Sequence, residues 1–250
     1  KQYRRELADV FEIQREIAAA VVEGLEVALS EESQARLQAR PTESLDAYML
    51  YLQGAEKLRG SQDEQAMREA GSLFDRALAL DATDAYAYDA LGNALMYQCR
   101  AAFGARTLPP TCERALRELT RAVTLSPRFP WGLNDLGNAY LFKGDFLARS
   151  GQSGVSEFQQ ALRLFRQAAE VDPTYVFALA NQLGALDRLA QAELGEGRDP
   201  RPVVDEAARL HEAIRAVNPG LESPYGRMLS LYANYISYLV YKDQDQIGRA

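Results

Sequence analysis

Few side chains in this sequence have the type and spacing that catalysis requires. The chain contains one histidine, His211, and two cysteines, Cys99 and Cys112. General acid–base catalysis by His211 would need a nucleophile or a carboxylate within reach, and the surrounding segment supplies only Asp205 and Glu212. We therefore expect His211 to pack between helices rather than to transfer protons.

The segment Gly132-Leu-Asn-Asp-Leu-Gly137 has the glycine spacing of a phosphate-binding loop. Such a loop needs a lysine and then a serine or threonine after the second glycine, because these side chains contact the phosphates and the magnesium ion. Asn138 and Ala139 stand there instead, and no predicted strand precedes the segment. We interpret the spacing as a coincidence within a helical repeat.

The sequence offers too few histidine and cysteine residues to form a typical metal site. Two thiols and one imidazole fall short of the four protein ligands that a structural zinc site normally takes. Four acidic residues stand at predicted turns between helices, where capping explains them: Asp81, Asp84, Asp172 and Asp199. The sequence therefore predicts no catalytic residue, no metal and no cofactor, and we expect a protein that is not an enzyme.

The two cysteines admit two interpretations. Cytosolic proteins keep their thiols reduced, and we favour two reduced thiols together with a cytoplasmic location. Cys99 and Cys112 nevertheless flank the loop of one predicted helical hairpin, so that a disulfide between them is geometrically conceivable.

Charge and hydropathy exclude two classes of partner. The net charge is −7, and both signs are interspersed without a basic block, which argues against nucleic acid or an anionic membrane surface as the main partner. No apolar run approaches the roughly 18 residues needed to span a bilayer, so we expect no membrane insertion. The chain begins inside a charged segment at Lys1, and we expect it to be a fragment of a longer protein.

Residues 161–173 are the clearest copy of a motif that recurs along the chain, an amphipathic helix that stops at a proline. The stop positions are 82, 127, 173 and 219, which are 45, 46 and 46 residues apart, and all but Ala82 are prolines. Self-similarity at such a period indicates stacked repeats, each of which buries its apolar face against the next. The sequence therefore predicts a binding scaffold.

Helical periodicity divides each repeat into a pair of helices, and no segment shows strand alternation. The predicted pairs are 44–59 with 63–80, 84–102 with 111–125, 130–149 with 155–171, and 175–194 with 203–217. We predict three parts: linker or cap helices at 1–40, four hairpins at 41–220, and a C-terminal helix within 221–250. An amphipathic helix is also expected at residues 9–29.

The repeat resembles the tetratricopeptide pattern, in which Leu-Gly on the first helix is followed by Ala-x-x-x-Phe on the second and then by proline. The matching residues are Leu91-Gly92, Leu136-Gly137 and Leu183-Gly184, then Ala115, Ala161 and Ala207. The resemblance implies an all-α, right-handed superhelical solenoid of antiparallel hairpins. Here the repeat is 45 or 46 residues, longer than the usual 34 or so, which predicts extended helices. We expect the small residues of each hairpin, such as Gly137 and Ala161, to face one another where its two helices cross.

Three further stretches resemble multidomain bacterial signalling proteins, the first two of them the junction that precedes the repeats. These are residues 9–18, followed by 44–54, and the segment Gly197–Pro202, which is most similar to members linked to a serine/threonine protein kinase. None of the kinase's own motifs occurs in this chain. The resemblance implies the sensory or recruitment region of such a kinase, lying outside its catalytic domain.

In tetratricopeptide proteins the first helix of each pair lines a concave groove, and the resemblance places eight groove residues here. They are Tyr86, Asp89, Asn93, Trp131, Asn134, Asn138, Asn181 and Arg188. An asparagine amide both donates and accepts hydrogen bonds, which suits an extended peptide backbone of any sequence. Relatives that clamp a C-terminal carboxylate use lysine or arginine at these positions, whereas this chain has chiefly Asp, Asn and Tyr. The resemblance therefore does not imply such a clamp here. The asparagines could equally solvate the groove or cap turns.

The sequence thus favours a scaffold that binds an extended segment of another protein. The alternative is self-association, or intramolecular regulation of a kinase or adenylate cyclase. A tyrosine-rich helix expected at residues 225–241 would be an exposed edge and a route to a homodimer if further repeats normally cover it.

Overall fold

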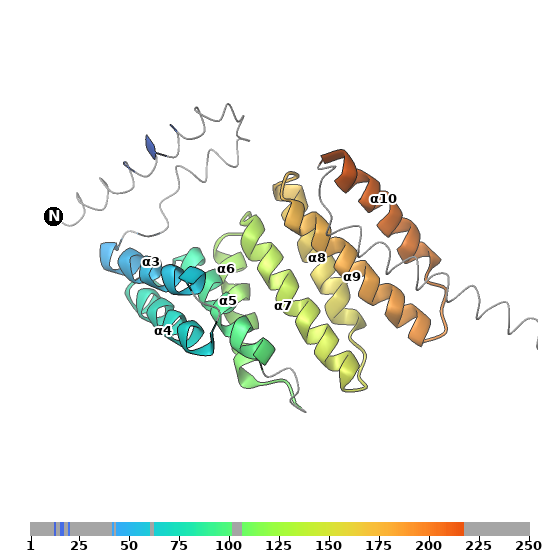
Figure 1. Ribbon diagram of the computed structural model, residues 1–250, viewed down its shortest axis with the longest axis horizontal. Coiled ribbons are helices and arrows are strands. Elements are labelled where there is room, and N and C mark those ends of the chain that lie inside the picture. The colour runs from blue at the N-terminus through green and yellow to red at the C-terminus, as the bar shows by residue number, and fades with distance from the viewer. Residues whose placement is uncertain are drawn as a thin grey trace, which may run out of the picture. The chain divides into compact units, whose positions relative to one another are not determined.

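The computed structural model describes residues 42, 44–60, 63–101 and 107–217, together with isolated positions at 13, 16, 17 and 20. Within these ranges all regular secondary structure is helical, with no strand (Figure 1). The helices are α3 (Leu45–Gly60), α4 (Glu64–Leu80), α5 (Ala85–Ala101), α6 (Pro110–Leu125), α7 (Pro130–Arg149), α8 (Val155–Val171), α9 (Val176–Gly195) and α10 (Arg201–Val217). Only those isolated positions of the helix expected at 9–29 are described, and the helix expected at 225–241 lies outside the residues described.

The helices pair in chain order, α3 with α4, α5 with α6, α7 with α8 and α9 with α10. The predicted all-α fold class, built from antiparallel helix hairpins, is confirmed. The chain forms two compact units, the first holding α3 to α6 and the second α7 to α10. Within the first unit α4 also packs on α5, and within the second α8 packs on α9, so that neighbouring hairpins stack as repeats do.

In the first unit the second helix of each hairpin places a large side chain over a glycine of the first helix. A Cβ atom added at Gly54 would lie 2.6 Å from the ring of Phe74, and one at Gly92 would lie 2.4 Å from Leu119. Phe74 and Leu119 are fully buried. The glycines therefore make room for apolar side chains that fill the hairpin's own core.

The second unit repeats this arrangement at both ends of the α7–α8 hairpin. Phe165 lies over Gly137, where an added Cβ would be 2.5 Å from the ring, and Phe158 lies over Gly144 at 2.4 Å. The expectation that Gly137 faces Ala161 is wrong, because the nearest neighbours of an added Cβ are the ring atoms of Phe165. The close approach accommodates an aromatic ring rather than an alanine.

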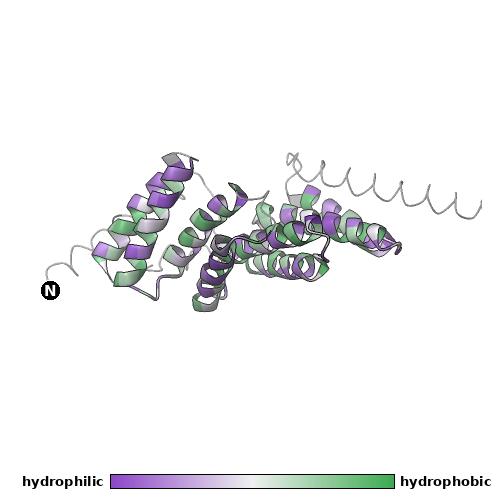
Figure 2. Ribbon diagram, turned by 90° about the horizontal axis from the view of Figure 1, so that it is seen from below, coloured by the Kyte–Doolittle hydropathy of each residue, from purple (hydrophilic) through white to green (hydrophobic). Residues whose placement is uncertain are grey.

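Helix ends follow ordinary capping chemistry. The Asp63 carboxylate caps α4 by accepting a hydrogen bond from the Ala66 amide at 2.7 Å. Prolines occupy the first positions of α6 and α7, where no amide hydrogen is needed. In Figure 2 the helices carry both apolar (green) and polar (purple) residues, as expected of helices that bury one face.

Cys99 and Cys112 form a disulfide, with Cα atoms 5.1 Å apart. It joins Cys99 of α5 to Cys112 in the first turn of α6, with a sequence separation of 13. The expectation of two reduced thiols is therefore wrong. Sequence reasoning failed here because the redox state depends on the compartment, whereas the spacing shows only that a bond can be made.

Candidate partner-binding faces

The eight predicted groove residues are divided between the two units. Three of them, which we call the α5 face, lie on α5: Tyr86, Asp89 and Asn93. The other five, which we call the α7–α9 face, lie on two first helices that contact one another: Trp131, Asn134, Asn138, Asn181 and Arg188. The structure joins Asn93 to Asp89 in the first face and Asn181 to Asn134 in the second, and we describe the two faces separately.

An amide pair joins the two helices of the α7–α9 face. The Asn181 side chain donates from Nδ2 to Oδ1 of Asn134, at 2.9 Å. The Asn134 amide donates in turn to Asp135, at 3.1 Å, and only 4% of Asn134 is exposed. Asn134 is therefore chiefly a bridge between α7 and α9, whereas Asn138, one turn further along α7, is half-buried. This bridge between helices is none of the roles considered for these asparagines, which were binding a partner, solvating the groove and capping turns.

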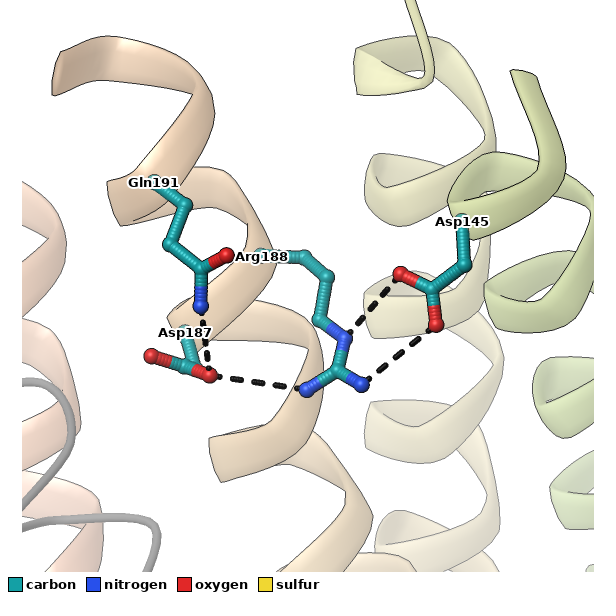
Figure 3. Close-up of polar contacts among 4 residues, drawn as sticks. All are labelled: Asp145, Asp187, Arg188 and Gln191. Atoms are coloured by element: carbon teal, nitrogen blue, oxygen red, sulfur yellow. Dashed lines mark hydrogen bonds and ion pairs between the residues drawn. The ribbon is translucent and has the colours of Figure 1, made fainter. Parts of the chain in front are cut away.

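The Arg188 guanidinium of α9 is held between two carboxylates (Figure 3). Its Nε and Nη2 atoms donate to the Asp145 carboxylate of α7 at 3.2 and 3.4 Å, and Nη1 donates to Asp187 at 3.4 Å. Gln191 donates to the same Asp187 oxygen at 3.0 Å. Because both edges of the guanidinium are engaged by acids of the chain itself, Arg188 does not provide a ready-made site for a partner's carboxylate.

Exposed aromatic rings stand at the first turns of both helices. Trp131 of α7 is 44% exposed and meets Phe129 edge-on, with ring centres 6.0 Å apart. Phe177 of α9 is 68% exposed, with the Tyr175 ring centre 5.9 Å away. Phe177 is not among the eight groove residues predicted from the sequence, and the residue after it, Ala178, is buried.

Sequence reasoning also missed Asp145, Asp187 and Gln191. Asp145 lies on α7 beyond the last numbered groove position, and it meets Arg188 across 43 residues of chain. Charged side chains of opposite sign near the ends of consecutive first helices were the available signal. The repeat pattern alone does not show which of them pair.

The α5 face is acidic and aromatic. Asp89 is buried and accepts a hydrogen bond from the Asn93 amide at 3.4 Å, while Tyr86 is half-buried. Tyr51 of α3 lies beside this face, and its pKa is raised to about 12, first by burial and then by the negative charges of Asp84 and Asp89. The Tyr51 phenol stays neutral, so the carboxylates beside it leave the α5 face acidic. A site that clamps a partner's carboxylate would need positive charge instead.

Asp84 caps α5 from a buried position. Its Oδ1 atom accepts hydrogen bonds from the backbone amides of Tyr86 and Ala87, at 2.9 and 3.1 Å. Its Oδ2 atom is buried and has no hydrogen-bond partner in the part of the chain that the structure describes. Burial raises the pKa of Asp84 to about 6, against the opposing effect of the two amides and with a smaller increase from the charge of Asp81.

Two kinds of site are not found among the described residues. No group of three or more His, Cys, Asp or Glu side chains there could hold a metal ion. None of the described helices combines the length and apolar character that crossing a membrane requires. His211, the remaining candidate for chemistry, is half-buried on α10.

Comparison with known proteins finds a shared fold. No family model and no curated protein matches the chain. Among solved structures, that of MamA protein is 15% identical and covers 79% of this chain and 88% of its own, with a TM-score of 0.53. YrrB, described as a TPR protein with an unusual peptide-binding site, is 16% identical over 85% and 90% of the two chains, with a TM-score of 0.47.

The structure of TTC0263, described as a thermophilic TPR protein in Thermus thermophilus, is 18% identical over 78% of this chain and 99% of its own, with a TM-score of 0.45. At these identities a likeness extends to the fold and no further. The fold of this chain is therefore an assembly of helix hairpins similar to that of the MamA structure.

Proposed function

We propose that the chain is a non-catalytic scaffold that binds an extended segment of another protein along the α7–α9 face. The observation that carries this proposal is the exposure of two aromatic side chains, Trp131 and Phe177, on contacting helices. Large exposed aromatic side chains are costly in water and are enriched where proteins bind one another. Ordinary core packing does not account for them, because both rings lie outside the buried core.

The amide bridge suggests how the face is kept ready for a partner. Asn181 and Asn134 fix α7 against α9 within two turns of the aromatic rings, so the rings are presented on a rigid pair of helices. A binding surface that is already ordered loses little conformational entropy when a partner binds. Asn138, half-buried on the same helix, supplies an amide that matches a peptide backbone.

The Arg188 contacts restrict the partner's chemistry. Asp145 and Asp187 already satisfy the guanidinium, so a partner's terminal carboxylate would have to displace one of them. We therefore propose an internal segment of a protein as the partner, with an apolar or aromatic side chain for the Trp131 and Phe177 end.

The setting of the scaffold is a proposal from sequence alone. The resemblance of Gly197–Pro202 and residues 44–54 to kinase-linked proteins supports a role as the recruitment region of a bacterial serine/threonine kinase. Residues 9–18, which carry the rest of the resemblance, lie largely outside the described part. Intramolecular regulation of a kinase or a cyclase is the alternative, as is self-association through residues 225–241. A cytoplasmic location rests on reduced thiols, and the paired cysteines count against it.

The test uses peptides selected for binding to the intact chain from a random display library. We expect Trp131→Ala and Phe177→Ala each to weaken a selected peptide at least about tenfold in fluorescence anisotropy, the scale at which an interface aromatic residue acts. Asn138→Ala should weaken binding with little effect on thermal unfolding. Asn134→Ala is a poorer probe, because it also breaks the bridge to Asn181.

Leu80→Ala is the matched control, because Leu80 is also a large exposed apolar residue but lies on a second helix. Peptides that bind the Trp131 and Phe177 variants as tightly as the unmodified chain would contradict the proposal. Sedimentation at several concentrations separates the alternative, since a concentration-independent monomer excludes self-association.

A further inference from the structure

The Cys99–Cys112 bond occupies a defined place in the repeat. Alignment of Gly92 with Gly137 places Cys99 at the position of Gly144 in the next hairpin. Alignment of Ala115 with Ala161 places Cys112 at the position of Phe158. The same two positions therefore hold a disulfide in the α5–α6 hairpin and a glycine–phenylalanine pair in the α7–α8 hairpin.

Both pairs are buried between the two helices of their hairpin, near the end at which the chain passes from the first helix to the second. Phe158 is 3% exposed, and its ring fills the space that a side chain at Gly144 would take. Cys99 and Cys112 are 0% and 2% exposed, so the disulfide is equally internal. The position of Cys112 is buried in every hairpin, since Met67 of α4 and Val204 of α10 hold it elsewhere.

Reduction would remove the covalent constraint at this position. The same two sulfur atoms remain, but they move from bonding distance to non-bonded contact, and nothing then holds the two helices together there. The bond closes a loop between residues with a sequence separation of 13. Closing a loop costs entropy, and a cross-link removes much of that cost from the folding step.

We propose that the α5–α6 hairpin is closed by oxidation, and that this chain works in an oxidising compartment, where the cross-link is permanent. Thiol reductants keep such bonds open in the cytosol. Bond formation removes two protons and two electrons from the two thiols, and a protein or small-molecule disulfide accepts them and is reduced to two thiols. The buried sulfurs of the folded hairpin are shielded from thiol attack, which suits a structural bond better than a switch.

The first test is thiol counting on the intact chain, produced once in an oxidising compartment and once in a reducing cytosol. Unfolding in the presence of an alkylating agent, followed by mass measurement, should show no modified cysteine in the first sample and two in the second. Two modified cysteines in the sample from the oxidising compartment would overturn the proposal.

The second test compares the stability of the oxidised and reduced chains. Reduction should lower the melting temperature of the first unit by about 10 °C, the shift expected for a cross-link across a short loop in a unit of this size. Hydrogen exchange locates the effect: amides of α5 and α6 should lose protection, whereas those of α7 and α8 should not. Equal melting and equal protection in the two states would overturn the proposal.

Variants separate the bond from the packing. Cys99→Ala with Cys112→Ala should melt like the reduced chain and be insensitive to reductant. Cys99→Gly with Cys112→Phe installs the pair of the α7–α8 hairpin, and should be insensitive to reductant while melting above the alanine pair. An alanine pair as stable as the oxidised chain, or a glycine–phenylalanine pair no better than alanine, would show that the disulfide does not replace a packing pair.

Discussion

Arg166 of α8 donates a hydrogen bond to Glu206 of α10, and the first unit makes the same contact with its charges exchanged. There the negative partner is Asp75 of α4, on the earlier helix, and the positive partner is Arg114 of α6. The two pairs occupy equivalent positions of the repeat. Asp75 and Arg166 directly follow the buried Phe74 and Phe165, and Arg114 and Glu206 directly precede Ala115 and Ala207. The repeat therefore keeps the contact between second helices while leaving its polarity open.

The exchanged polarity makes a direct test possible. Arg166→Glu places two acids opposite each other and should destabilise the second unit by up to about 1 kcal/mol, since pairs this exposed contribute little. Arg166→Glu combined with Glu206→Arg copies the order of the first unit and should recover the loss. Urea unfolding of the three proteins measures the effect, and a double variant no more stable than the single one would contradict it.

Gly137→Ala should destabilise the second unit by about 1–3 kcal/mol, because the added methyl group would lie 2.5 Å from the Phe165 ring inside a full core. The loss should shrink when Phe165→Leu is introduced as well, since a smaller side chain then faces the methyl group. Calorimetric melting of the two single variants and the double variant gives the coupling between the two sites.

Gly60→Ala is the matched control, because it also adds a methyl group to a helical glycine but meets nothing within 4 Å. Helix propensity alone should then act, giving a gain of up to about 1 kcal/mol. A loss at Gly60 similar to that at Gly137 would show that steric contact is not the cause.

Asp84 should make the first unit less stable as the pH rises. Its pKa in the folded chain, about 6, lies above the ordinary value of 3.8, so the protonated form is the one that folding favours. Its stabilising contribution is complete below pH 3.8 and is lost as the pH rises through about 6, by on the order of 3 kcal/mol. Asp84→Asn keeps a capping oxygen and should remove this part of the slope in urea unfolding between pH 4 and 7. An unchanged slope would assign the effect to other groups.

Arg188→Ala should cost the second unit about 1–2 kcal/mol, because the buried Asp187 and the half-buried Asp145 lose the cation that they share. Arg188→Lys should recover only part of the loss, since an ammonium group cannot serve both edges at once. Thermal unfolding at low and high salt checks this, and a lysine variant as stable as the original would show that charge alone suffices.

Apolar spacing and proline stops predicted most of the fold. The helix from 155 to 171 was predicted at its observed bounds, because its buried residues recur at three and four and Pro173 prevents its continuation. The role of Gly137 was predicted less well, since spacing shows that a small residue is needed but not which side chain fills the room. Tertiary contacts decided that Phe165, rather than Ala161, lies there.

The candidate faces were less predictable than the helices. Repeat numbering placed Trp131 and Asn138 on the first helix correctly, yet it gave no sign that Asn134 is used internally by Asn181. Whether a polar side chain meets a partner or a neighbouring helix depends on the angle between helices, which the sequence pattern does not specify. Phe177 was not predicted, because no groove position of the repeat pattern falls on it.

Because the Cys99–Cys112 bond holds the ends of α5 and α6 together, the connection between them is relieved of that task. The α7–α8 connection has no such freedom, since a Cβ at Gly154 would lie 2.4 Å from the Gly144 carbonyl oxygen. If a foreign loop, epitope or fluorescent reporter were inserted between Cys99 and Cys112, the disulfide would hold its two ends together. Of these two hairpins, the one with the disulfide is therefore the better place for such an insertion.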